Sequence, residues 1–76
     1  MSHTFSLVIH NEPSVLLRIS GIFARRGYYI SSLHLNERDN NGVSEMKLTA
    51  VCTENEATLL VSQLKKLIDV LQVNTL

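Results

Sequence analysis

The spacing of apolar residues along the chain changes from a period of two to a helical period, and the change occurs twice. In residues 4–10, TFSLVIH, the apolar residues Phe5, Leu7 and Ile9 alternate with mostly polar neighbours, which predicts a half-buried β-strand. From Val15 onward the spacing becomes that of an amphipathic helix. The apolar side of this predicted helix consists of Val15, Leu16, Ile19, Ile22 and Phe23.

Residues with special backbone properties mark the two ends of this helix. Pro13 suits the first turn, because the N–H group that proline lacks has no helical partner there. Gly27 is predicted to end the helix, and Arg25 and Arg26 suit the negative end of the helix dipole. Asn11, in the polar loop before the helix, is predicted to cap it, and the amides of residues 14 to 16 form a helix start that suits a carboxylate. A loop that does no more than cap its own helix is the simpler interpretation, since such caps are routine.

Two further strands and a turn are predicted after this helix. The strand at 28–36 has its apolar residues at Tyr28, Ile30, Leu33 and Leu35. Its parity changes across Ser31–Ser32, which indicates a β-bulge. Residues 39–42, DNNG, predict a tight turn, because Asn-Gly tolerates positive φ angles. The strand at 43–52 then places one set of residues on the inward face: Met46, Leu48, Ala50 and Cys52.

The last third of the chain predicts a second helix and a fourth strand. Residues 53–56, TENE, form a capping-box pattern at the start of the helix. The helix is predicted to bury Ala57, Leu60, Val61, Leu64 and Leu67. Residues 68–73 complete the order strand, helix, strand, strand, helix, strand. This order predicts an α+β, ferredoxin-like βαββαβ sandwich, with one four-stranded antiparallel sheet and two helices on one face. We expect residues 1–76 to form one domain, and such domains host many functions.

Composition excludes several classes of protein. The chain has 76 residues with seven basic and seven acidic side chains, and zero net charge argues against nucleic acid or an anionic membrane as the main partner. An RNA-recognition module shares this topology but needs aromatic residues on its central strands, and the strand at 43–52 has none. No apolar run approaches the roughly 18 residues of a membrane span, and MSHTFS lacks a basic segment leading into an apolar core. We therefore expect a cytoplasmic protein.

The residues that carry chemistry do not form a catalytic set. Catalysis requires a nucleophile with a base, paired carboxylates or a set of metal ligands. The histidines are His3, His10 and His34, and together with one cysteine they do not match a zinc pattern. Cys52 follows the inward parity of its strand, which favours a buried structural thiol. As the single cysteine it leaves no internal disulfide, which fits a reducing compartment. We predict no catalytic residue and no metal site.

Two segments carry a resemblance to a known family. NEPSVLLRISGIFARRGYYISSL (11–33) and QLKKLIDVLQV (63–73) resemble the small regulatory subunit of acetolactate synthase, which begins with an amino-acid-binding ACT domain of ferredoxin-like fold. The likeness covers about residues 4–74. In that family the large subunit carries thiamine diphosphate, magnesium and FAD, and it condenses 2-oxo acids at the start of branched-chain amino-acid biosynthesis. The resemblance implies a regulatory chain without cofactors that activates this large subunit.

The resemblance also implies an effector site between two paired ACT domains, with valine as the usual effector. The corresponding positions are Asn11, Ser14, Val15 and Leu16 before and in the first helix, with Tyr29 and Ile30 on the next strand of the other protomer. The valine-sensitive pattern has Gly in place of Ser14 and usually Asn in place of Tyr29. The side chain of Ser14 leaves a ligand less room to approach the backbone than glycine would. Tyr29 offers only a hydroxyl, whereas asparagine offers the polar groups of an amide. We therefore predict that valine binds weakly or not at all.

A stripe of small and apolar residues on the first helix predicts self-association. Leu17, Gly21 and Ala24 lie opposite the predicted core side, at i, i+4 and i+7. Small residues allow another helix to approach closely, and association would help to stabilise a domain of this size. The alternative is a scatter of single exposed apolar residues, which is common. We expect a homodimer that contacts the large subunit. A free-standing ACT-domain amino-acid sensor that regulates another protein is the alternative function.

Overall fold

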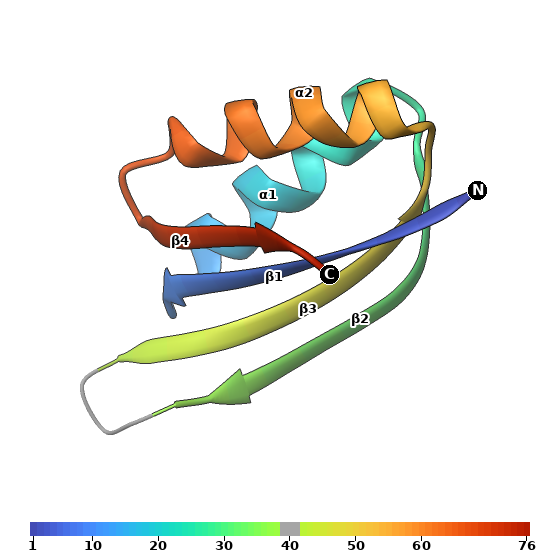
Figure 1. Ribbon diagram of the computed structural model, residues 1–76. Helices are drawn as coiled ribbons and strands as arrows, with labels where there is room; N and C mark the ends of the chain where they lie inside the picture. The colour runs from blue at the N-terminus through green and yellow to red at the C-terminus, as the bar shows by residue number, and fades with distance from the viewer. Residues whose placement is uncertain (39–41) are drawn as a thin grey trace.

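The fold is a single sheet with two helices packed on one of its faces. The computed structural model describes residues 1–38 and 42–76. Its elements are β1 (Ser2–His10), α1 (Pro13–Arg25), β2 (Tyr29–Glu37), β3 (Val43–Val51), α2 (Glu54–Lys65) and β4 (Val70–Thr75). All strand pairs are antiparallel, in the order β2-β3-β1-β4, and both helices lie on the same side of the sheet (Figure 1). The predicted ferredoxin-like βαββαβ sandwich is confirmed.

The apolar pattern places the core between the sheet and the helices. Most of the predicted inward residues of β1, β3 and α1 are fully buried, whereas Leu16 and Ile22 on α1 are only partly buried. The fully buried set includes Phe5, Leu7, Ile9, Val15, Ile19, Phe23, Met46 and Leu48. The rings of Phe5 and Phe23 meet edge to face, with centroids 5.8 Å apart, which joins β1 to α1. Cys52 is only 5% exposed, so the prediction of a buried thiol is confirmed. Burial raises the pKa of this thiol.

Several predicted boundaries differ from the structure. The fourth strand begins at Val70 and not at residue 68, because Ile68 lies in a turn and is 89% exposed. In that turn the amide of Val70 donates to the carbonyl oxygen of Leu67 at 3.1 Å. The predicted bulge is confirmed, since the pairing of β2 with β3 shifts between Ile30 and Ser32. Most of the predicted turn at 39–42 lies outside the described residues.

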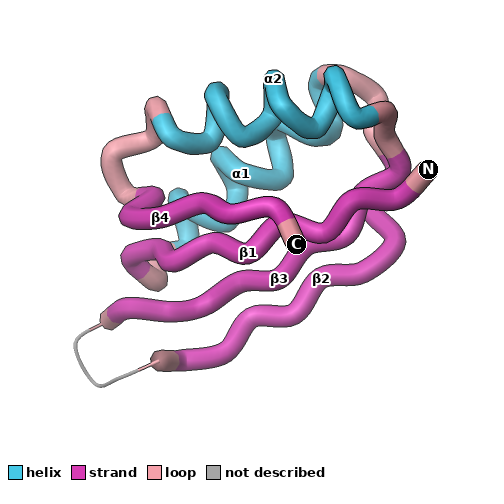
Figure 2. The backbone as a smooth tube through the Cα atoms, viewed as in Figure 1, coloured by secondary structure: helices cyan, strands magenta, loops and turns pink. Residues whose placement is uncertain are grey.

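The edge strand β2 is less covered than its pattern predicts. Leu33 and Leu35 pair with Leu48 and Met46, so they lie on the helix side of the sheet. Even so, Leu33 is 43% exposed and Leu35 is 38% exposed. Figure 2 shows β2 running away from the helix layer toward its C-terminal end. An apolar strip therefore remains open at this edge.

The start of α2 is a complete capping box, as predicted. The amide of Thr53 donates to Oε1 of Glu56 at 2.8 Å, and the amide of Glu56 donates to Oγ1 of Thr53 at 3.2 Å. The first of these bonds lowers the pKa of the Glu56 carboxyl group. Tyr28, between α1 and β2, has its pKa raised by desolvation and by the nearby Glu56. The capping box therefore lies beside the connection from α1 to β2.

Replacing the cap tests this account of the start of α2. We expect Thr53→Ala to lower the free energy of unfolding by about 1 kcal/mol, because one amide of the first turn loses its acceptor. Thr58→Ala in the same helix is the matched control, since its hydroxyl only donates to a carbonyl oxygen within the helix. Urea unfolding measures both variants. Equal stability of Thr53→Ala and the native chain contradicts the role of the cap.

Acid unfolding tests the charge of Glu56. Its folded-state pKa is lowered, so the carboxylate stabilises the fold at pH values above about 4.5, the ordinary pKa of a glutamate. This contribution is lost as the pH falls through the folded-state pKa. We expect the difference in stability between the native chain and Glu56→Ala to shrink on acidification. A difference that stays constant from neutral to acidic pH rules this out.

Candidate functional site

The loop between β1 and α1 is held by its backbone. The amide of Asn11 donates to the carbonyl oxygen of Gly42 at 2.6 Å, which ties the loop to the start of β3. Glu12, and not Asn11, occupies the N-cap position of α1, with φ −125° and ψ 146°, and its side chain makes no capping bond. The prediction that Asn11 caps this helix is therefore wrong. Asn11 lies one residue before the cap, and its amide is bonded to Gly42.

The first turn of α1 has fewer open amides than predicted. Pro13 has no N–H group, and the amide of Val15 donates to the carbonyl oxygen of Glu12 at 3.0 Å. Among the described residues, the amide of Ser14 has no backbone partner. The Val15 side chain is 1% exposed and belongs to the core, and Leu16 is partly buried against it. The exposed side chains of Asn11 and Ser14, together with the open amide of Ser14, are therefore available to a ligand at this loop.

A group of charged residues supports the same loop from the β4 side. The amide of His10 donates to the carbonyl oxygen of Asp69 at 2.9 Å, and the two side chains lie 3.3 Å apart, Nδ1 to Oδ1. Arg18 on α1 approaches the other carboxylate oxygen at 3.8 Å. Sequence analysis missed this contact because His10 and Asp69 are 59 residues apart. The antiparallel fold alone brings the end of β1 beside the start of β4.

A groove lies between α1 and the start of β2. It has a volume of about 530 Å³ and is lined by Leu17, Ser20, Gly21, Ala24, Tyr28, Tyr29 and Ile30. The structure thus brings the three predicted dimer-contact residues together with two of the predicted effector residues. Leu17 is 74% exposed and Tyr29 is 70% exposed. A Cβ atom at Gly21 would meet nothing within 4 Å, so the space above it is open.

The six predicted effector residues form two separate sets within one chain. Asn11 and Ser14 lie at the N-terminal end of α1, whereas Tyr29 and Ile30 follow its C-terminal end (Figure 1). A helix of 13 residues spans about 20 Å at about 1.5 Å per residue. A free amino acid is much shorter than this distance. One ligand therefore contacts both sets only if a second chain supplies one of them.

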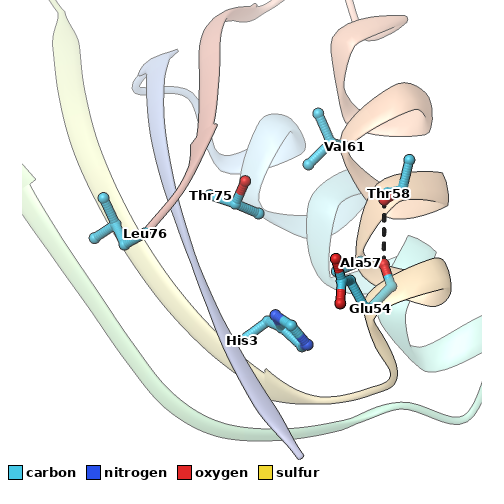
Figure 3. A pocket seen from close by; sticks show the side chains of 7 residues that line it. All are labelled: His3, Glu54, Ala57, Thr58, Val61, Thr75 and Leu76. Carbon is cyan, nitrogen blue, oxygen red and sulfur yellow. Dashed lines mark hydrogen bonds between the residues drawn. The ribbon is translucent and has the colours of Figure 1, made fainter.

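A second pocket lies at the opposite edge of the sheet, between α2 and β4 (Figure 3). Its volume is about 400 Å³, and its lining includes His3, Glu54, Ala57, Thr58, Val61, Thr75 and Leu76. His3 belongs to β1, which begins two residues earlier than predicted, and its pairing with Ala50 places it on the helix side. Its Nε2 atom is buried without a hydrogen-bond partner among the described residues. The sequence did not indicate this pocket, because the predicted strand began at residue 4 and therefore left His3 outside the sheet.

The described residues bring no three histidine, cysteine or acidic side chains together in a group suited to a metal ion. Within the same ranges, no helix is both long and apolar enough to cross a membrane. The features described above are thus an open groove at each edge of the sheet and a polar loop; a smaller pocket of about 250 Å³ is lined by Ile22, Arg25, Arg26 and Gln63.

Comparison with known proteins gives consistent relatives. A family model described as ACT domain matches residues 11–73. The chain is 39% identical over 72 residues to acetolactate synthase small subunit 1, chloroplastic, of Nicotiana plumbaginifolia, which covers 95% of this chain and 16% of that protein. It is 37% identical over 76 residues to the acetolactate synthase isozyme 3 small subunit of Escherichia coli, which covers 100% of this chain and 47% of that protein.

Solved structures agree with this result. The crystal structure of the acetolactate synthase small subunit from Thermotoga maritima superposes with a TM-score of 0.86 at 29% identity, over 99% of this chain and 47% of that one. The ACT domain of a GTP pyrophosphokinase from Chlorobium tepidum superposes at 0.81 with 21% identity, over 100% of this chain and 97% of that one, which shows the fold alone. The chain spans less than half the length of the curated relatives named above. On the match to residues 11–73, this chain belongs to the ACT-domain family.

Proposed function

We propose that this chain is the regulatory small subunit of a cytoplasmic acetolactate synthase. In this role it performs no chemistry and raises the activity of a large subunit that holds thiamine diphosphate, magnesium and FAD. The observation that carries the proposal is the likeness to proteins named as acetolactate synthase small subunits from plants, archaea and bacteria, which extends over 95 to 100% of the chain. The resemblance of residues 11–33 and 63–73 supports the same assignment.

The groove between α1 and β2 supports a homodimer as the regulatory unit. Gly21 lies inside a helix, where glycine costs roughly 0.5–1 kcal/mol relative to alanine, and no atom of residues 1–38 or 42–76 lies close enough to require it. The lack of a side chain instead suits a second helix that approaches from outside. Leu17 gains from burial in the same contact, as does the open strip at Leu33 and Leu35.

A two-fold axis near the middle of β2 would also complete the effector site. Antiparallel pairing of two β2 strands about such an axis places Tyr29 of one chain near Glu37 of the other. Glu37 pairs with Ser44, and Ser44 pairs with Ile9, two residues before Asn11. The start of β2 from one chain then lies beside the loop of its partner. This arrangement unites the two sets of effector residues that a single chain keeps apart.

The contacts for valine in this site are weak. A helix start favours an anion by only about 0.3–1 kcal/mol when it is exposed. The bond from Val15 to Glu12 occupies one of the predicted amides, and Ser14 and Tyr29 remove space and polar groups that the valine-sensitive pattern provides. Effector coupling is typically about 1–3 kcal/mol, so the loss of one good contact is enough to weaken feedback. The subunit on this account activates more than it inhibits.

Reconstitution tests the proposed function. We expect the purified chain to form no acetolactate alone and to increase the turnover of its cognate large subunit until the two are saturated. Acetolactate formation measures both results, and an unrelated ACT domain serves as the control protein. Unchanged turnover at saturation contradicts the regulatory role. If the chain nevertheless binds an amino acid in calorimetry, the free-standing sensor is the better function.

The substitution Gly21→Ala tests the dimer because two measurements should move in opposite directions. We expect the free energy of unfolding of a dilute monomer to rise by roughly 0.5–1 kcal/mol, since alanine favours the helix and its Cβ meets no atom. We expect the dimer to weaken in analytical ultracentrifugation, because the added methyl group lies in the contact. Ser62→Ala, on the exposed side of α2, is the control. If Gly21→Ala dissociates at the same concentration as the native dimer, the interface does not include this side of α1.

The double substitution Ser14→Gly with Tyr29→Asn tests the two departures in the effector site. We expect it to increase the affinity for valine in isothermal titration calorimetry, because it restores space beside the loop and an amide on β2. Circular dichroism checks that glycine leaves α1 intact. Micromolar binding of valine by the unmodified chain contradicts this account of Ser14 and Tyr29.

A further inference from the structure

The edge formed by α2 and β4 lies on the far side of the sheet from the groove between α1 and β2. The strand order β2-β3-β1-β4 places the two features at opposite edges, so pairing through β2 leaves β4 open. We propose that an extended segment of the large subunit adds to β4 as a further strand and inserts a lysine or arginine side chain into the pocket between α2 and β4. This inference rests on the proposed function, because it names the docking surface for that partner.

The backbone of β4 presents free hydrogen-bonding groups along this edge. The amide of Leu76 donates to the carbonyl oxygen of Thr4 at 2.8 Å, and residues of antiparallel strands alternate between bonding toward and away from the neighbour. Gln72 and Asn74 therefore bond toward β1, whereas the N–H and C=O groups of Val73 and Thr75 point outward. In the part of the chain that the structure describes, no strand pairs with β4 on that side.

This edge lacks the features that usually prevent pairing. Natural edge strands are commonly protected by charged residues or proline, and the sequence of β4, VLQVNT, has neither. A pairing shift opposite Val8 and Ile9 affects only the beginning of the strand. The stretch from Gln72 to Thr75 keeps a regular register with β1 and forms a continuous template. A strand-forming peptide satisfies such an edge, whereas a small molecule leaves most of its groups unpaired.

The neighbouring pocket specifies the side chain of the added strand. Alternate residues of a strand point to opposite faces, so every second residue of the segment faces the helix side, where the pocket opens (Figure 3). Ala57, Val61 and Leu76 line the pocket with apolar groups, and Glu54 supplies a carboxylate. A long aliphatic stem with a cationic head matches both features.

His3 gives a second, independent indication that this pocket lacks a partner. Its ring lines the pocket, and its Nε2 atom is buried without a hydrogen bond among the described residues. A buried polar atom that stays unpaired costs free energy, so most such atoms in folded proteins have a partner. Docking that turns the His3 ring toward the pocket and supplies a hydrogen-bond partner for this nitrogen would recover that cost.

The same features argue against a second copy of the chain at this edge. Two β4 strands paired with each other would offer only the side chains of VLQVNT, which include no lysine or arginine for the pocket beside Glu54. A dimer formed through β2 has two β4 edges on its outer sides. Each edge is then available to one large subunit.

Binding of the cognate large subunit to variants of the 76-residue chain tests this surface. Thr75→Pro removes the outward N–H group, and proline is tolerated where an edge N–H faces solvent. We expect Thr75→Pro to weaken binding by about tenfold or more, with the activation curve shifted to the same extent. Thr75→Val retains the N–H group and is the matched control. Circular dichroism establishes whether each variant is folded.

The pocket is tested separately, which keeps the inference decidable if Thr75→Pro does not fold. We expect Glu54→Gln to weaken binding severalfold at low salt, because the cationic side chain loses its partner. Glu12→Gln, at the other end of the molecule, is the control and should bind like the native chain. Thr58→Trp, which fills the pocket, should weaken binding at any salt concentration.

The outcomes separate this surface from the proposed function. If the native chain neither binds nor activates the large subunit, both the function and the docking surface are wrong. If the native chain activates and the folded β4 and pocket variants bind equally well, only the docking surface is wrong. If Thr75→Pro instead dissociates a homodimer in ultracentrifugation and leaves binding of the large subunit unchanged, β4 joins two copies and this inference is overturned.

Discussion

The burial of one side of α1 against β1 determines the rest of the structure. Phe23 meets Phe5 edge to face, and Val15 and Ile19 are fully buried beside them. These contacts set the rotation of the helix about its axis, because its apolar side has to face the sheet. The opposite side, with Gly21, is therefore exposed next to the start of β2. The same packing fixes where the loop before α1 emerges, so both parts of the candidate effector site depend on it.

Local patterns were sufficient to predict the order of elements, the inward residues and the capping box, since each depends on neighbours within a few positions. The errors occur where distant segments decide. Asn11 is not the cap, because α1 begins at Pro13 and Glu12 takes the N-cap position, while the amide of Asn11 donates to Gly42 just before β3. Ile68 is apolar but lies in a turn that leads into β4, and Leu33 has the right parity on an edge that the helices do not cover. His3 was missed because β1 extends beyond its most regular part.

The sequence named candidate site residues but did not indicate how they are arranged. The family resemblance supplied Ser14 and Tyr29 together, and nothing in a single sequence indicates that they lie at opposite ends of α1. Val15 was predicted as an effector contact, yet its side chain belongs to the core, so only its backbone faces the loop. The spacing of the two sets, about 20 Å along α1, is a property of the folded chain. In the proposed dimer, a site divided in this way would couple ligand binding to pairing of the two chains.

The two edges of the sheet differ in chemistry, and this difference suits two kinds of partner. The edge at β2 presents Leu17 and Gly21, which are neutral and allow a like surface to approach closely. Among the described strands none pairs with the outer edge of β4, so this edge presents backbone groups and the carboxylate of Glu54, which a like surface does not complement. A domain of this size buries only about 60% of the surface that its unfolded chain exposes, so association adds much of what its own core cannot supply. The proposed use of one edge for self-association and the other for a different protein matches that division.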